Sequence, residues 1–192
     1  MQLEAFDPDV LQARVPAGSR VFRLAKFKST FDASPAGRCP ALSEFSPSKA
    51  DAEEAAAKGW PAAGISLWDL ARTAVDTQTA AAQVRDRERA GDDAAKLHAA
   101  DEASRVAYLA NVDPVHAMQC TSDGSPAYLL IHAPATKGPD PDAHVALFGL
   151  PCKYPPRKLQ SPALEENRQR LLQLFQRDPP VISPHGPDAE TP

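Results

Sequence analysis

The sequence predicts an α+β fold: a mostly antiparallel sheet of about five strands, with flanking helices and a charged helical insertion. Helical patterns interrupt the early strand patterns, whereas several strand patterns follow one another late in the chain. This order suits α+β better than a doubly wound parallel sheet. The 192 residues are 43% hydrophobic and 24% charged, which is typical of a globular chain with one substantial core.

One domain is expected over residues 1–178. Residues 179–192, PPVISPHGPDAETP, lack core-forming side chains and are predicted to be a disordered tail. Residues 84–103 favour helix strongly, yet Val84 and Leu97 are their only sizeable apolar side chains. We therefore expect a charged, largely solvated helical arm there. The simpler interpretation of its charges is a solvent-exposed helix face, and partner binding is the less common one.

The first strand is predicted over residues 20–28, RVFRLAKFK, where alternation directs Val21, Arg23, Ala25 and Phe27 to one face. Arg23 is thus expected among apolar neighbours. Burying an unpaired guanidinium is costly, so this arginine either reaches water at a strand end, meets a carboxylate, or binds an anionic ligand.

A helix is predicted over residues 47–58, after two candidate capping serines. If Ser48 is the cap, Asp51 completes a capping box; if Ser46 is the cap, Pro47 takes the first helical position. In either case a serine oxygen and free backbone N–H groups lie at the helix entry. Simple capping and anion binding are both compatible with such an arrangement.

The other elements follow from periodicity. A long helical region is predicted to begin at residues 65–69, with Trp68 as a core anchor. Strands are expected at residues 105–112, 115–120, 127–132 and 143–150, the second and third forming a hairpin. The last helix follows Ser161-Pro162, and its apolar stripe should pack on the sheet; the stripe consists of Leu164, Leu171, Leu172 and Phe175.

Composition excludes several function classes. The net charge of −4 and the pI near 5.7 give no overall attraction to nucleic acid or anionic membranes. The N-terminus has no apolar signal-peptide core, and no run of eighteen apolar residues is present. A cytoplasmic location is the default, although export without a signal peptide would leave the same sequence.

Common catalytic and metal-binding motifs are absent. The sequence has no phosphate-binding loop, no zinc-protease motif and no paired metal-ligand spacing among its five histidines and three cysteines. A thiolate–imidazole pair between Cys152 and either His132 or His144 is geometrically conceivable, although an idle cysteine is the commoner case.

The order of elements resembles ADP-ribosyltransferase-fold proteins and is similar to small toxins of that fold delivered by bacterial type VI secretion systems. The residues that carry the resemblance are VFRLAKF with Arg23, FSPSKADAEEAAA with Ser46 and Ser48, and DAHVALFGLP with Asp142 and His144.

This resemblance implies that Arg23 holds the phosphates of NAD and that Ser46 or Ser48 orders the nicotinamide pocket. Asp142 and His144 stand where the family has its glutamate. Asp142 would supply negative charge, and His144 would act as a base or orient the ligand. The competing hypothesis is a non-catalytic protein-protein interaction module, such as an immunity or adaptor protein, in which Arg23 pairs with an internal acid.

Overall fold

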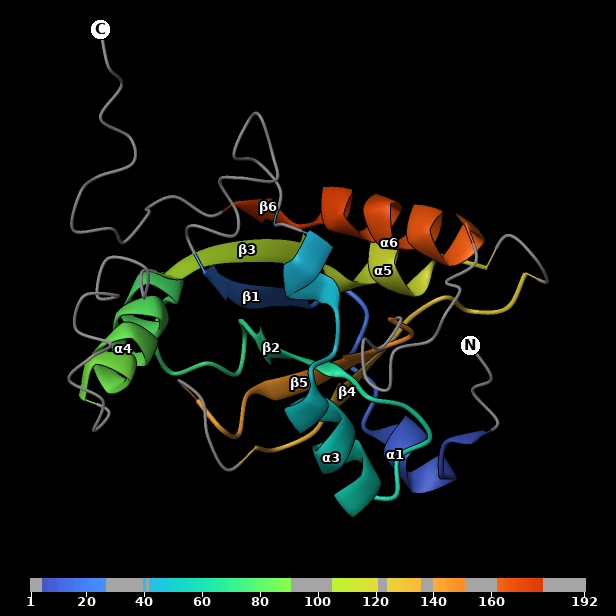
Figure 1. Cartoon of the computed structure of the whole chain (residues 1–192), viewed down its shortest axis with the longest axis horizontal. Helices are drawn as coiled ribbons and strands as arrows, with labels where there is room; N and C mark the ends of the chain where they lie inside the picture. Colours follow the sequence, from blue (N-terminus) through green and yellow to red (C-terminus); the bar gives the residue numbers. More distant parts are fainter. Residues whose placement is uncertain are drawn as a thin grey trace, which may run out of the picture.

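The computed structural model describes residues 5–26, 40, 42–90, 105–120, 124–135, 140–150 and 162–177. In this part of the chain a single antiparallel sheet carries helices on both faces (Figure 1), so the expected α+β class is confirmed. The strand order is β4-β5-β2-β1-β3-β6, and every pairing is antiparallel. Five strands make up most of the sheet, and the sixth is a two-residue edge.

The strands are β1 (Arg20–Lys26), β2 (Ile65–Asp69), β3 (Arg105–Asn111), β4 (Leu129–His132), β5 (His144–Phe148) and β6 (Gln176–Arg177). The helices are α1 (Pro8–Gln12), α3 (Lys49–Ala57), α4 (Thr77–Ala90), α5 (Val112–His116) and α6 (Pro162–Leu174), with a 3₁₀ turn η2 (Leu42–Phe45). Among the described helices, none is long and apolar enough to cross a membrane.

Each face of the sheet buries its own set of apolar side chains. On the first face η2, α5 and α6 cover the sheet, and they lie above it in Figure 1. The main contacts there are made by Val21, Leu67, Tyr108, Leu147, Phe45, Val115, Leu171 and Phe175. On the second face α4 covers Phe22, Trp68 and Leu109 through Ala80 and Ala81, whereas α1 and Phe6 cover Ile131 and Phe148. Both faces are therefore buried, and polar groups between them need internal partners.

The predicted start of a long helix at residues 65–69 is wrong, because these residues form β2 in the middle of the sheet. Ile65 and Leu67 face the first side, and Trp68 faces the second. A Cβ at the preceding Gly64 would lie 3.1 Å from the Phe148 ring, so glycine permits this close approach. The helix begins only at Thr77, where the Asp76 carboxylate accepts a hydrogen bond from Thr79 N at 2.7 Å.

The expected hairpin strand at residues 115–120 is also wrong. Residues 112–116 form α5, whose Val112 and Val115 are fully buried in the core. Only one isolated bridge, Gln119 to Pro126, remains of the predicted pairing. Val115 contributes to the core from a helix turn, which its β-branched side chain and strand-like neighbours did not indicate.

Other expectations are confirmed within a few residues, among them β1, β3, β5, α3, α6 and the burial of Trp68. The first part of the predicted charged arm belongs to α4, which ends at Ala90. Residues 91–103 and the predicted tail, 179–192, lie outside the described residues.

Candidate functional site

Arg23, the predicted phosphate ligand, is held on the first face by internal acceptors. Its Nη1 donates to the Ser66 carbonyl oxygen at 2.8 Å, and its Nη2 donates to the Glu44 carbonyl oxygen at 3.1 Å. The Glu44 carboxylate lies 4.0 Å from the same Nη2, and the Arg23 side chain is 18% exposed. Of the three fates considered for this arginine, pairing with an acid and nearby carbonyls is the one observed.

The two candidate serines have different partners. Ser48 caps α3, because its Oγ accepts from Asp51 N while the Asp51 carboxylate accepts from Ser48 N at 2.6 Å. This is the capping box expected for Ser48. Ser46 instead accepts a hydrogen bond at 2.6 Å from Nη1 of Arg168 on α6.

Arg168 was not predicted as a site residue. It is 6% exposed, and its Nη2 donates to Glu165 Oε2 at 2.6 Å. Its Nε is buried without a hydrogen-bond partner among the described residues. We call Arg23, Glu44, Ser46, Glu165 and Arg168 the arginine cluster; in it, two guanidiniums fasten residues 44–46 to the sheet and to α6.

A sequence signal for Arg168 was available. It follows Leu164 by four residues and precedes Leu171 and Phe175 by three and seven, so it lies on the apolar stripe of the helix. A charge on such a stripe is expected to be buried and paired. A basic residue after the acidic first turn also agrees with the helix dipole, which is a simpler explanation for the same residue.

His144 belongs to the second face. It is 4% exposed, its ring meets Trp68 edge-on with centroids 6.1 Å apart, and its Nδ1 lies within hydrogen-bond distance of the Ala133 carbonyl oxygen. Burial lowers the pKa of His144, and the hydrogen bond to Ala133 partly opposes that shift. Asp142, two residues earlier, is exposed.

The predicted catalytic side chains are not brought together. Arg23 is the strand partner of Tyr108 on the first face, whereas Phe22, Trp68 and His144 align across three strands on the second. Paired residues share a face, so the sheet separates Arg23 from His144. Of the predicted cofactor-binding residues, Arg23 and Ser46 both flank Glu44, and Ser48 does not join them.

A second polar pair, also missed by the sequence, joins the ends of β2 and β4. His132 Nε2 lies 2.8 Å from Asp69 Oδ2, and their side chains are 8% and 4% exposed. Asp69 Oδ1 also accepts from Ala71 N at 2.9 Å, and Arg72 Nε lies 3.8 Å from Oδ2. A carboxylate that orients an imidazole is the arrangement of a general base, with Nδ1 left for a proton.

Neither a cysteine partner nor a metal site is established for this pair in the described part of the chain. Cys152, the predicted partner of His132 or His144, lies outside the described residues, so that hypothesis stays a prediction. The described part of the chain has no group of three or more histidine, cysteine or acidic side chains that could hold a metal ion. The Asp69–His132 pair therefore has the geometry of a carboxylate-oriented imidazole, to which the described residues add no metal site.

Comparison with known proteins adds nothing to these contacts. Neither the protein-family models, nor the curated proteins, nor the solved structures include a match to this chain. Function is therefore inferred from the arginine cluster, His144 and the surface.

Proposed function

We propose that this chain is a non-catalytic protein-binding module of the immunity or adaptor kind. The observation that carries the proposal is the separation of Arg23 from His144 by the sheet. Both side chains also have internal partners, namely the Ser66 and Glu44 carbonyls for Arg23 and the Ala133 carbonyl for His144. Groups that are buried and paired in this way stabilise a fold, and they are poorly placed to meet a substrate together.

The binding surface we favour is α4 with the charged sequence that follows it. Its first half buries Ala80 and Ala81 against the sheet, while Gln78 and Thr79 are exposed. The sequence then runs RDRERAGDDAAK, which carries charges of both signs. A partner whose charges alternate in the opposite sense would complement this pattern. Such complementary charges would contribute to the specificity of binding more than to its affinity.

One observation favours the alternative, an ADP-ribosyltransferase-like toxin that handles NAD. Arg23 and Ser46 both adjoin Glu44, and Arg168 adds a second buried cation there. A diphosphate would suit two arginines and a hydroxyl, provided that residues 44–46 moved away. Under this alternative Asp142 and His144 would not contact the same part of NAD as the arginine cluster, since the sheet separates His144 from the cluster.

Two measurements on the purified chain distinguish the candidates. For a binding module, incubation with NAD releases no nicotinamide, and Arg23→Lys changes nothing in that assay. Nicotinamide release that Arg23→Lys abolishes would instead support the toxin.

The second measurement concerns the surface. We expect the wild type to retain a specific protein from cells that express the chain, and a variant with Arg85, Arg87 and Arg89 changed to Glu to lose it. Lys49→Glu, on the exposed side of α3, is the matched control and should retain the partner. Equal retention by both variants would remove α4 from the interface.

A further inference from the structure

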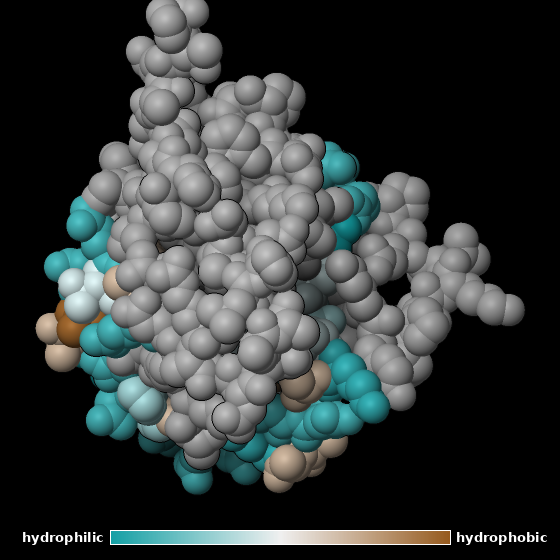
Figure 2. Space-filling view, turned by 60° about the vertical axis from the view of Figure 1, so that its left-hand side comes forward, coloured by the Kyte–Doolittle hydropathy of each residue, from teal (hydrophilic) through white to brown (hydrophobic). Residues whose placement is uncertain are grey.

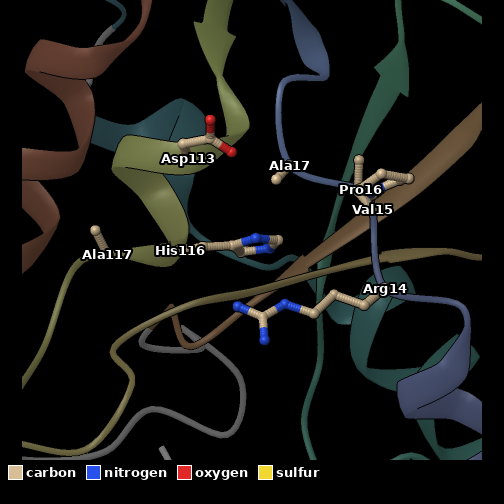
Figure 3. A pocket seen from close by; sticks show the side chains of 7 residues that line it. All are labelled: Arg14, Val15, Pro16, Ala17, Asp113, His116 and Ala117. Atoms are coloured by element: carbon tan, nitrogen blue, oxygen red, sulfur yellow. The ribbon is translucent and has the colours of Figure 1, made fainter.

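A cavity of about 460 Å³ opens where the segment after α1 passes α5. Its lining comes from Arg14, Val15, Pro16 and Ala17 on one side and from Asp113, His116 and Ala117 on the other (Figure 3). The volume is within the range of small-molecule sites. The cavity is separate from the arginine cluster and from the Asp69–His132 pair, none of whose residues line it.

Two polar side chains in this cavity have no partner in the described part of the chain. The Arg14 guanidinium is exposed and makes no hydrogen bond or ion pair with a described residue. His116 Nε2 is buried and likewise has no hydrogen bond with a described residue. A buried nitrogen without a partner costs free energy, which a ligand oxygen would recover once the His116 ring turned to bring this nitrogen to the cavity surface.

The two side chains line the same cavity. In Figure 3 the Arg14 guanidinium lies directly below the His116 ring, with Asp113 on the other side of the ring. Their proximity is also electrostatic: burial and, less strongly, Arg14 lower the pKa of His116, Asp113 raises it, and the resulting pKa is about 4. A guanidinium beside a neutral imidazole suits a single negative charge better than a doubly charged group, because Asp113 is near.

The rest of the wall is apolar and held in place. Asp113 Oδ1 accepts a hydrogen bond from Gly18 N at 2.9 Å, which fixes the turn after Ala17 against α5. Gly18 has a φ of +77°, a conformation that glycine adopts without strain. Pro16 and Ala117 then offer small apolar surfaces on either side of the charged groups.

We propose that this cavity binds a small organic carboxylate, whose charged group lies between Arg14 and His116 and whose apolar body contacts Pro16 and Ala117. Arg14 would hold the carboxylate through two parallel N–H donors, and His116 Nε2 would donate or share the proton that completes the site. The carboxylate belongs either to a free acid or to the C-terminus of a peptide, since both present the same group. This inference is independent of the protein-binding function proposed above.

The test is a titration of the isotope-labelled chain, followed by amide NMR, with butyrate and with acetyl-Ala-Val, each compared with its neutral amide. We expect saturable shifts confined to the backbone amides of residues 14–18 and 113–117, other than Pro16 and Pro114, for the acids and none for the neutral amides. Tighter binding of acetyl-Ala-Val than of butyrate would assign a peptide C-terminus, and the reverse order a free acid. Equal shifts with acids and amides, or none with either acid, would overturn the proposal.

Variants sharpen the assignment. Arg14→Gln should weaken acid binding about tenfold, the loss typical of a charge-assisted hydrogen bond, and His116→Phe should weaken it while keeping the ring volume. Arg170→Gln, an exposed arginine on α6, is the matched control and should bind as the wild type does. Saturation should also raise the pKa of His116, followed through its ring proton; unchanged affinity in Arg14→Gln, or an unchanged pKa, would contradict the site.

Discussion

Arg23 and His144 project from opposite faces of one sheet, although only β2 separates their strands. The reason is the period of two along each strand, since Phe22, and not Arg23, aligns with Trp68 and His144. Teal and brown residues are mixed on the described part of the surface in Figure 2, with a small hydrophobic patch at its left edge. The separation makes Arg23 a structural residue in the first instance, which leads to the first prediction.

Arg23→Ala should lower the free energy of unfolding by about 1–3 kcal/mol, because two partly buried carbonyls lose their donor and Glu44 loses its counter-charge. The measurement is urea unfolding followed by circular dichroism. Arg20→Ala, the same change at an exposed position of β1, should stay within about 0.5 kcal/mol of the wild type. Equal stability of the two variants would refute a structural role for Arg23.

The Asp69–His132 pair should behave as a coupled unit. We expect Asp69→Asn and His132→Gln each to destabilise the chain by about 2 kcal/mol, because each leaves a buried polar partner unsatisfied. In the double variant the losses should not add, and the cycle should give a coupling of about 1 kcal/mol or more. Ser48→Ala, at the start of α3, serves as the uncoupled control, and additive losses for Asp69 with His132 would mean that the pair contributes little.

The two serines before α3 should be separable by their dependence on Arg168. Ser48→Ala should cost about 1 kcal/mol as a lost helix cap, with Ser48→Thr close to the wild type. Ser46→Ala should cost about as much, because a buried Arg168 donor loses its acceptor. In an Arg168→Met background the Ser46 penalty should largely vanish while the Ser48 penalty persists; identical behaviour of both serines would show that Ser46 also acts as a cap.

Local patterns were sufficient for the elements whose pattern is sustained or capped. The strand around Arg23 is a sustained apolar run with Val21, Phe22 and Leu24, and α3 has a complete capping box. The five residues of β2 are too few to fix a period, and Trp68 also continues a helical spacing into the residues that follow. Only the pairing of β2 between β1 and β5, which is a tertiary fact, resolves that ambiguity.

The candidate sites depended even more on tertiary pairing. The sequence placed Arg23 on a buried face but gave no means of choosing Glu44, twenty-one residues away, as its partner. Asp69 and His132 are sixty-three residues apart in the sequence. They meet across β5, which lies between their two strands. The burial of Arg168 could have been predicted from the sequence, since a charged residue on an apolar stripe requires a buried partner of some kind.

The last prediction concerns the pH dependence of stability. Burial lowers the pKa of His116 to about 4 and also lowers the pKa of His144, whereas both titrate near 6.5 when unfolded. Between about pH 4 and pH 6.5 the unfolded chain therefore binds more protons than the folded chain. The contribution of these histidines to the free energy of unfolding should be complete above about pH 6.5 and should decrease as the pH falls toward 4. The slope contributed by His116 should approach about 1.4 kcal/mol per pH unit, and His144 adds to it in the same direction.

Urea unfolding at a series of pH values measures this slope. His116→Gln should remove one histidine's share, so the difference between variant and wild type isolates His116 from the carboxylates that titrate at lower pH. Arg14→Gln should reduce the slope more weakly, because burial is the larger cause of the shift and the Arg14 charge the smaller. A profile that His116→Gln leaves unchanged between about pH 6.5 and pH 4 would mean that His116 is protonated in the folded chain, and that Arg14 and Asp113 balance differently around it.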